Sequence, residues 1–536
     1  MRALKKPAAD VPCGRVLKGH SFSCAAEVLY FCSLERASAR ERVASIAAKA
    51  VVCSILLLAL VAGTLAQTQP TPWNQLKFPP LPPFEPQQPT RVQLANGMVI
   101  FLQPDHELPL ISATARIRGG EISEPPAKTG LVALYGEVWR TGGTKTKTGD
   151  QMDDFLETRA AKIETGDGSD STTISLNCLK GDFDAVFDMY LDLLRNPEFR
   201  DDKLELAKQQ MYTGIARRND EVGSIVGRES AILAFGKDNP YAREEEFTTV
   251  FAVKRDDLVN WHEQYVYPNN IIFGISGDFD PKAMEAKLRL TFESWAKGPE
   301  AKTPDVKFTS AKPGYYFVQK TDINQSTIAM LDLGIRRDNP DYFAVSVMNE
   351  IFGGGFSSRL FNNVRAAKGL AYSVGGGVGT SFSHPGMTDI RMQTKSGSTV
   401  AGIQALYEEI DNLHTKDPDA TELQRAKDQI LNSFVFRLDT PGKVLAEKMT
   451  YEFYHYPLDF LERYRSEIEK VTAQQVTQVA RKYLHKDKLA VLVVGNDGEF
   501  DKQLSSLGSV TNVDITIPPP PKELMQQMGQ PGMDNQ

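Results

Sequence analysis

The sequence predicts an α+β protein built from two copies of one unit. A strong hairpin signal stands near the start of the globular part, and helical and strand-like segments are mixed along the chain. The stretch from Tyr265 to Asp280, YVYPNNIIFGISGDFD, recurs as YLHKDKLAVLVVGNDGEFD from Tyr483 to Asp501. Tyr265 stands as far before Gly277 as Tyr483 stands before its own glycine. One repeat at this long period indicates a duplicated domain.

The local patterns within each copy favour antiparallel strands covered by helices. RVQLANGMVIFLQPD (91–105) places Asn-Gly between two alternating apolar runs, which predicts a β-hairpin. Residues 111–119 alternate as a strand does, whereas 184–196 and 201–220 have helical periodicity. We therefore expect each half to be an antiparallel-rich sheet with packed helices, and not a doubly wound fold.

Proline-rich segments mark the limits of the globular part. Residues 77–90 contain six prolines, and PPPP stands at 518–521, so both stretches are expected to be extended tethers or tails. The polar residues 298–314 are interpreted as the linker between the halves. The predicted organisation is a signal segment (1–66), a tether (67–91), an N-terminal half (92–297), the linker (298–314), a C-terminal half (315–517) and a tail (518–536).

The beginning of the chain resembles a secretory signal. An apolar run at 50–63 follows Arg40, Arg42 and Lys49, and small residues at 64–66 suit a signal peptidase. The run is short for a membrane span, although an uncleaved signal anchor is the alternative. The residues ahead of it are either a long n-region or a misassigned start. We expect an exported protein of a bacterial periplasm, associated with a membrane only if the signal is uncleaved.

Composition narrows the classes of partner. The chain has 536 residues, 41% of them hydrophobic and 24% charged, with a formal net charge of −7. Lysine and arginine occur only in short groups, which argues against nucleic acid as the main partner. Cleavage after residue 66 would leave Cys178 as the single cysteine, so no internal disulfide or cysteine-based zinc site is expected.

Several motifs, in order, resemble the pitrilysin/insulinase family. They are Pro109-Leu110, RGGE (118–121), GLVALYGEVWRTGGT (130–144) and FGGGFSSRLFNNVRAAKGLAYSVGG (352–376). The resemblance covers roughly residues 92–500. Members of that family are zinc peptidases with an H-x-x-E-H helix. The resemblance implies two α+β halves per unit, assembled with a second chain as a clamshell around a peptide.

The zinc-binding residues of that family are replaced in this chain. Placed on 130–144, the two histidine positions fall on Ala133 and Glu137, and the general-base position falls on Gly136. The region of the third ligand falls near 212–214, which has no carboxylate. No two of the seven histidines stand one helical turn apart, so they cannot form a substitute pair. We expect no metal on this chain, and we interpret Glu137 as a solvated or ion-paired helix acid.

The second half keeps residues that the resemblance makes functional. Arg365 and Tyr372 match a pair that family members place over the active site of the opposite half, where it holds the substrate backbone and stabilises the oxyanion. The alternative is an ordinary surface ion pair and a strand tyrosine. Gly353, Gly354 and Gly355 lack the lysine of a phosphate-binding loop, so a flexible turn is expected. The resemblance implies contact with substrate, because a non-catalytic family member uses a glycine-rich loop in that way.

The resulting expectation is a zinc-less subunit of a heteromeric metallopeptidase. A zinc-bearing paralogous chain would supply the metal, and this chain would supply Arg365 and Tyr372 for hydrolysis of a peptide. The alternatives are a structural subunit and a peptide-binding, chaperone-like homodimer of the same fold. Independent zinc peptidase activity is disfavoured because every position of the metal site is changed at once.

Overall fold

A computed structural model describes residues 43–54, 75 and 85–529, with the side chains of 527–529 excepted. The chain divides into two units, Met1–Pro83 and Phe84–Gln536. In the first unit, residues 43–54 form an exposed helix, and the rest of the expected signal segment lies outside the described residues. Within the described stretches, no helix is both long enough and apolar enough to cross a membrane. The fold that follows is that of the second unit.

The first half is built on a six-stranded, mostly antiparallel sheet in the order β1-β2-β6-β3-β5-β4. The predicted hairpin is confirmed, since β1 pairs antiparallel with β2 through Thr90↔Leu102 and Gln93↔Val99. Only the β2–β6 pair is parallel. The strands are β1 (Thr90–Gln93), β2 (Val99–Pro104), β3 (Leu110–Arg118), β4 (Lys162–Gly166), β5 (Ser171–Leu179) and β6 (Ile271–Gly277).

The second half repeats five strands of this sheet, which confirms the predicted duplication, whereas its edge strand β14 follows β13 in the chain and pairs parallel with β7. Its order is β10-β12-β8-β13-β7-β14, and a small parallel pair, β9 with β11, stands apart. The strand after each repeated tyrosine, β6 or β13, lies between one parallel and one antiparallel neighbour. The strands are β7 (Gly314–Gln319), β8 (Gln325–Leu333), β9 (Ile335–Arg336), β10 (Ser373–Gly377), β11 (Thr380–Ser381), β12 (Met387–Lys395), β13 (Ala490–Gly495) and β14 (Val510–Asn512).

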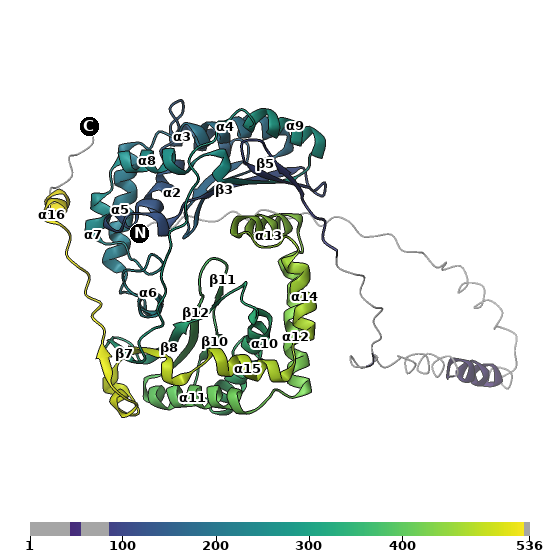
Figure 1. Ribbon diagram of the computed structural model, residues 1–536. Coiled ribbons are helices and arrows are strands. Elements are labelled where there is room, and N and C mark those ends of the chain that lie inside the picture. The colour runs from purple at the N-terminus through teal and green to yellow at the C-terminus, as the bar shows by residue number, and fades with distance from the viewer. Residues whose placement is uncertain (1–42, 55–74, 76–84, 530–536) are drawn as a thin grey trace, which may run out of the picture. The chain divides into compact units, whose positions relative to one another are not determined.

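Helices pack on both sheets (Figure 1). The predicted helices at 184–196 and 201–220 are α4 and α5. The first half has α2 (Leu131–Thr141), α3 (Gly149–Glu157), α4 (Phe183–Arg195), α5 (Asp201–Arg217), α6 (Val222–Phe235), α7 (Phe247–Ala252), α8 (Arg255–Tyr265) and α9 (Pro281–Phe292). The second has α10 (Tyr342–Phe352), α11 (Thr399–Thr415), α12 (Ala420–Phe434), α13 (Pro441–Tyr454), α14 (Phe460–Lys470) and α15 (Ala473–Tyr483). Helix α16 (Lys522–Gly529) lies in the predicted tail, and its Leu524 packs into the core of the first half.

The two halves exchange one helix each. Helix α6 belongs to the first half in sequence, but Ile225 and Val226 pack into a buried cluster with β8 and β13 of the second sheet. Helix α13 does the reverse, because Leu445 and Met449 pack against Phe101 and its neighbours on the first sheet. Figure 1 shows α13 beneath the sheet that contains β3 and β5. Each sheet thus has one face covered by its own helices and part of the other covered by a helix of the opposite half.

Asp170 is a polar junction between the halves. Its carboxylate accepts hydrogen bonds from Tyr241 in the first half (3.0 Å) and from Ser383 (3.0 Å) and Tyr454 (2.8 Å) in the second. Burial raises the pKa of Tyr454 to about 12, so this phenol stays a proton donor at neutral pH. A single carboxylate therefore satisfies three hydroxyl groups from separate segments.

We predict that Asp170→Ala destabilises the protein by about 1–3 kcal/mol, because three part-buried hydroxyls lose their acceptor together. Chemical unfolding monitored by circular dichroism measures this change. Asp184→Ala is a matched control, since Asp184 is 81% exposed in its ion pair with Lys287. Equal stability of the two variants would show that Asp170 contributes nothing to the junction.

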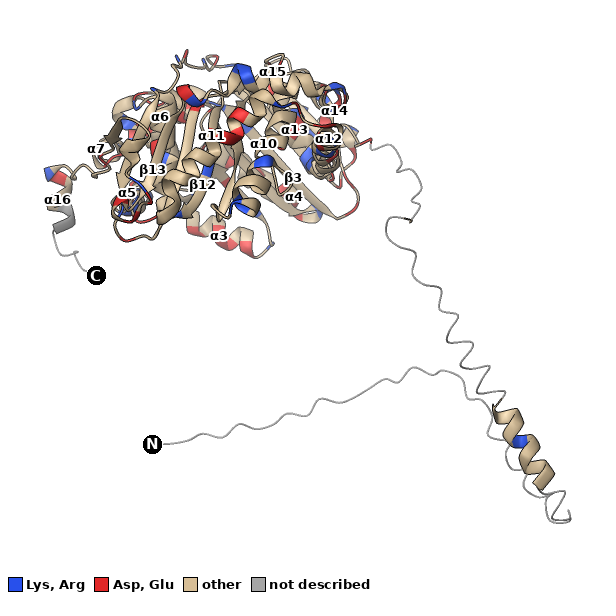
Figure 2. Ribbon diagram, turned by 90° about the horizontal axis from the view of Figure 1, so that it is seen from below, with Lys and Arg blue, Asp and Glu red and all other residues tan. Residues whose placement is uncertain are grey.

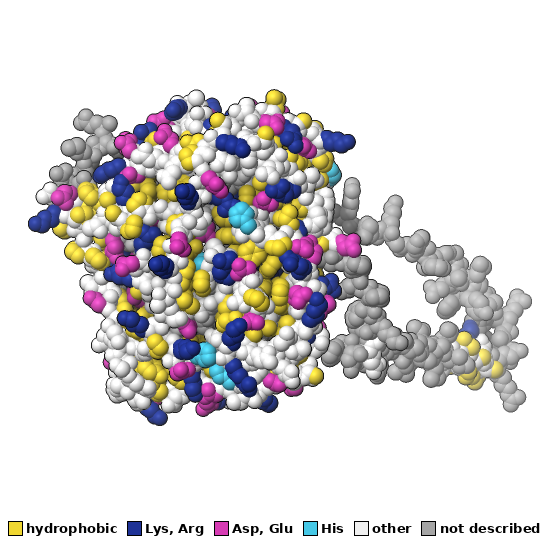
Figure 3. Space-filling view, in the orientation of Figure 1, with side chains coloured by type: hydrophobic (Ala, Val, Ile, Leu, Met, Phe, Trp, Pro, Cys, Tyr) yellow, Lys and Arg dark blue, Asp and Glu magenta, His cyan; other side chains and the backbone are white. Residues whose placement is uncertain are grey.

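Charges of both signs are interspersed over the described part of the chain. In the view of Figure 2, Lys and Arg residues and Asp and Glu residues are both scattered over the two halves, although α3 and α11 carry only acids. In Figure 3, hydrophobic side chains gather near the middle of the face shown, in the region where Figure 1 places α13 and β11. Apolar side chains therefore lie at the surface near the junction between the halves.

Candidate functional site

Helix α2 is the helix on which the family resemblance places a zinc site. It follows Gly130, whose φ of +99° lies in the left-handed region that favours glycine. The Glu124 carboxylate accepts from the backbone N–H groups of Gly130 and Val132, both at 3.1 Å, and so caps the first turn. Burial raises the pKa of Glu124 to about 7, although these hydrogen bonds oppose the rise. Glu124 therefore holds the first turn of α2 in place without a metal ion.

The residues at the metal positions do not fit a zinc ion. Ala133 is half-buried and offers no ligand atom, and Glu137 is exposed with no ion pair among the described residues. A Cβ atom added at Gly136 would lie 3.0 Å from Oδ1 of Asp167. Asp167 therefore occupies the space that the side chain of a general base at position 136 would need. In the described part of the chain, no group of three or more His, Cys, Asp or Glu residues could hold a metal ion. The Tyr212 side chain, in the region of the third ligand, is buried against Phe247.

The inward face of α2 is an aromatic packing surface. The Tyr135 hydroxyl lies 2.9 Å from Nδ1 of His262, and Trp139 donates to the Leu193 carbonyl at 2.9 Å. The Tyr135 and Trp139 rings lie 5.1 Å apart between centroids, and they contact Phe199 or His262 at 5.5–6.1 Å. Burial lowers the pKa of His262 to about 3, so this imidazole is neutral at physiological pH. Its environment is that of a core residue, closed off from a metal.

Arg365 and Tyr372 lie on one tightly held turn of the second half. Arg365 is in a π-helical segment, η6 (Leu360–Ala367), and Tyr372 directly precedes β10. Gly369, at φ +64°, reverses the chain between them and donates to the Arg365 carbonyl at 3.1 Å. The backbone N–H of Tyr372 donates to the Gln393 carbonyl at 2.8 Å. The backbone of the pair is therefore preorganised on the edge of the second sheet.

Both side chains of the pair are available for a further partner. Tyr372 is 73% exposed, which is high for a tyrosine on ordered backbone. The Arg365 guanidinium lies over the Phe361 ring, 4.8 Å from its centroid, and makes no hydrogen bond or ion pair with the described side chains. Phe356 is 80% exposed and contacts Phe361 edge-to-face at 5.1 Å. The alternative interpretation, an ordinary surface ion pair, is thus not seen for Arg365 among the described residues.

The glycine triplet packs more closely than the expected flexible turn. A Cβ atom at Gly353 would lie 2.4 Å from the Gly376 carbonyl oxygen of β10, and Gly376 donates to the Gly353 carbonyl at 3.3 Å. Gly354 would meet the Glu350 carboxylate at 2.6 Å, and Gly355 the Gln429 amide at 2.7 Å. Close backbone approach therefore accounts for Gly353, and a role of the triplet in binding substrate stays a prediction.

We predict that Gly353→Ala lowers stability by about 1–3 kcal/mol, because its methyl group would overlap a backbone oxygen that cannot move independently of β10. Gly214→Ala is the matched control. Gly214 lies inside α5 with no atom within 4 Å of its Cβ position, so we expect about 0.4–1 kcal/mol of stabilisation. Thermal unfolding of both variants measures the contrast, and a neutral Gly353→Ala change would contradict the close packing.

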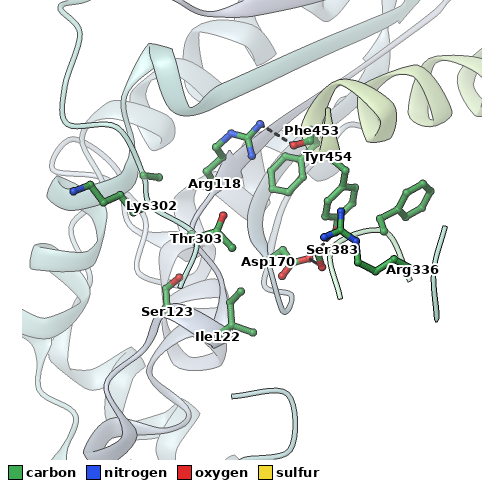
Figure 4. Close-up of a pocket in the computed structure, with 13 residues that line it drawn as sticks. Arg118, Ile122, Ser123, Asp170, Lys302, Thr303, Arg336, Ser383, Phe453 and Tyr454 are labelled. Atoms are coloured by element: carbon green, nitrogen blue, oxygen red, sulfur yellow. Dashed lines mark hydrogen bonds between the residues drawn. The ribbon is translucent and has the colours of Figure 1, made fainter. Parts of the chain in front are cut away.

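A cavity of about 120 Å³ lies between the halves near the Asp170 junction (Figure 4). Arg118 lines it from β3 and donates to the Phe453 carbonyl at 2.7 Å, the dashed contact in the close-up. Lys302 and Thr303 line it from the linker, and Ser383 lines it from the second half. These contacts could not be predicted beyond the strand alternation at 111–119, since they join segments that are far apart in the chain.

Comparison with known proteins decides the family. The family model described as "Insulinase (Peptidase family M16)" matches residues 102–237, and the model "Peptidase M16 inactive domain" matches 252–430, so together they cover more than half of the chain. The chain belongs to the insulinase family of peptidases. The first model extends from β2 to the end of α6 and includes α2, and the second extends from the end of α7 through β6 and α9 into α12 of the second half.

Curated relatives share the family at low identity. An uncharacterized zinc protease of Mycobacterium leprae is 24% identical over 350 residues, which are 64% of this chain and 78% of that protein. A non-peptidase homologue, YmxG, of Helicobacter pylori is 23% identical over 401 residues, 74% of this chain and 91% of that protein. This chain is therefore similar both to a protein named as a zinc protease and to one named as a non-peptidase homologue.

Solved structures confirm the two-half α+β fold. A peptidase M16 inactive domain from Pseudomonas fluorescens superposes with a TM-score of 0.67 at 22% identity, covering 76% of this chain and 98% of that one. A protease from Helicobacter pylori superposes with a TM-score of 0.68 at 16% identity, covering 76% and 100%. Together with the residues at 133, 136 and 137, the comparisons support an inactive-type homologue of the insulinase family.

Proposed function

We propose that this chain is the zinc-less subunit of a two-chain peptidase, with the metal on a zinc-bearing paralogue. In the assembly, Arg365 and Tyr372 reach the partner's active site and contact the peptide at the scissile bond. A guanidinium and a phenol hydroxyl are both suitable donors to the oxygen that becomes negative as an amide is hydrolysed. The clamshell formed by the two chains encloses the peptide.

The single observation that carries this proposal is the availability of Tyr372 and Arg365 on a rigid turn. Exposing a tyrosine ring and leaving a guanidinium without a carboxylate contributes little to the stability of this chain alone. Both features are useful when a second surface and a substrate cover them. The naming of the Helicobacter pylori relative as a non-peptidase homologue supports the absence of independent peptidase activity.

Complementation tests the proposal. The purified chain and its zinc-bearing paralogue are assayed separately and after mixing, with a quenched fluorescent peptide as substrate. We expect hydrolysis by the mixture to exceed the summed rates of the separate chains by at least about a hundredfold. Association without any gain in hydrolysis would favour a structural subunit, and self-association with peptide binding would favour a chaperone-like homodimer.

We also propose that the chain acts after export to a periplasm. The apolar run at 50–63 and the small residues at 64–66 support this location. Fractionation of the native host, followed by determination of the N-terminus of the mature protein, tests it. A mature chain that retains the run in the cytoplasmic fraction would contradict export.

A further inference from the structure

Residues 513–524 form a strap that crosses from the second half to the first, the yellow segment that leads to α16 in Figure 1. Its first residues, VDITI, alternate part-buried apolar and exposed polar side chains, as an extended segment against a surface does. Val513 and Ile515 pack against the buried cluster of α6, β8 and β13, whereas Ile517 packs against the core of the first half. The Val513 backbone N–H donates to a carbonyl of β7 at 2.8 Å. The strap thus begins on the second sheet and ends on the first half.

One side chain anchors the far end of the strap. Leu524, on α16, is 1% exposed and belongs to the buried core of the first half. The residues on either side of it on α16, Glu523 and Met525, are exposed. A helix of eight residues is marginally stable in water by itself, so α16 depends on packing to keep its place. The attachment of the strap to the first half therefore rests largely on Leu524, with Ile517 against the same core.

A polar cavity of about 520 Å³ lies beneath the strap. Residues 513–516 form one wall of this cavity. Charged side chains of both signs line the others, among them Arg228 and Glu229 of α6 and Arg243 and Glu244 of the loop that follows α6. A polar space of this size is large enough for water, so this part of the strap is not sealed against the loop by apolar packing. The strap is therefore held mainly at its two ends.

Asn219 connects the strap to α6. Its Nδ2 donates to the Ile515 carbonyl at 2.6 Å, and its Oδ1 accepts from Nη2 of Arg228 at 2.8 Å. Arg228 is 9% exposed and also donates to the Glu229 carboxylate and to the Arg218 carbonyl. Asn219 thus supplies one of the acceptors that a buried guanidinium requires. If the strap leaves, Asn219 loses its own acceptor, and the cluster on which α6 packs loses the apolar side chains of the strap.

We propose that the strap is a latch that holds α6 in place between the halves, and that release of Leu524 mobilises α6. Leu524 fixes the strap in the core of the first half. The strap carbonyl at Ile515 then binds Asn219, which in turn binds Arg228 of α6. Apolar contact adds to these hydrogen bonds, since the strap and α6 share one buried cluster. The latch belongs to this chain alone and needs no zinc-bearing partner, so its test is separate from complementation.

Hydrogen–deuterium exchange of the full chain, followed by mass spectrometry, tests the latch. Leu524→Asp places a carboxylate where the core is apolar and should release the strap. We expect the amides of the strap and of α6 to exchange at least about tenfold faster than in the unaltered chain, because release opens both segments. The amides of α11, which packs in the separate core of the second half, should exchange at the unaltered rate.

Further variants identify the cause of the faster exchange. Met525→Asp is the matched control, because Met525 is 48% exposed and a charge there should leave every exchange rate unchanged. Leu524→Met keeps an apolar side chain of similar volume and should keep the latch closed. Ile517→Asp should release the strap from the same core and reproduce the faster exchange of α6. Release of the strap with unchanged exchange in α6, no release by either Leu524→Asp or Ile517→Asp, or equal acceleration in α11 would overturn the proposal.

Discussion

Replacing Arg365 with alanine lowers peptide hydrolysis by the mixture of this chain with its zinc-bearing paralogue about a hundredfold or more. The charge that develops on the former carbonyl oxygen then loses a guanidinium that the second half holds next to β10. Removing one such donor typically raises the barrier by about 3 kcal/mol. The cation–π contact with Phe361 lies at the surface, so its loss should change folding stability little.

Tyr372→Phe separates the hydroxyl group from the ring. If the hydroxyl stabilises the oxyanion, kcat falls while KM is unchanged; if it only holds the substrate, KM rises. Arg463→Ala and Tyr316→Phe are the matched controls on this chain, since Arg463 is exposed on α14 and the Tyr316 hydroxyl bonds only to the nearby Lys312 carbonyl. Full activity of the Arg365→Ala and Tyr372→Phe mixtures, with normal association, would exclude the proposed roles.

Lowering the pH from 7 to 5 should remove about 2 kcal/mol of stability through His262 alone. The unfolded chain protonates this imidazole near pH 6.5, whereas burial lowers the folded pKa to about 3. Between these values the unfolded state binds the additional proton, so the stability present above pH 6.5 is lost as pH falls. A slope of about 1.4 kcal/mol per pH unit over roughly 1.5 units gives that figure.

Buried carboxyls act in the opposite direction and must be separated from His262. Burial raises the pKa values of Glu121, Glu124 and Glu244 to about 7, so these groups stabilise the folded state as pH falls from 7 toward 4.5. The measurement is therefore the difference between the unaltered chain and His262→Gln, which keeps a hydrogen-bonding group beside Tyr135. Urea unfolding at pH 7 and pH 5 gives both values. If the unaltered chain and His262→Gln lost the same stability between pH 7 and pH 5, the result would contradict a neutral, buried His262 behind α2.

Local patterns allowed much of the fold to be predicted. The Asn-Gly turn sets the β1–β2 hairpin, and the repeated tyrosine-to-glycine segment marks β6 and β13, because turn chemistry and alternation act over a few residues. The exchange of α6 and α13 could not be predicted in this way. Both helices are amphipathic or apolar, and the sequence of one helix does not show which of the two sheets it will pack against.

The candidate sites show the same limit. The helix α2 can be predicted from the pattern of residues 130–144. The absence of its metal ligands can be predicted from Ala133, Gly136 and Glu137. The contact of Arg118 with the Phe453 carbonyl could not be predicted, because it joins residues 335 positions apart in the sequence. Gly353 looked like part of a flexible turn because sequence does not reveal that β10 passes beneath it.

The metal content of the purified chain tests the account most directly. The chain is prepared without chelators, equilibrated with a slight excess of Zn²⁺, freed of unbound metal by gel filtration and analysed by inductively coupled plasma mass spectrometry. The positions at 133, 136 and 137 and the absence of a metal-binding group among the described residues predict far less than one zinc per chain. One tightly held zinc per chain, retained through filtration, would contradict the account.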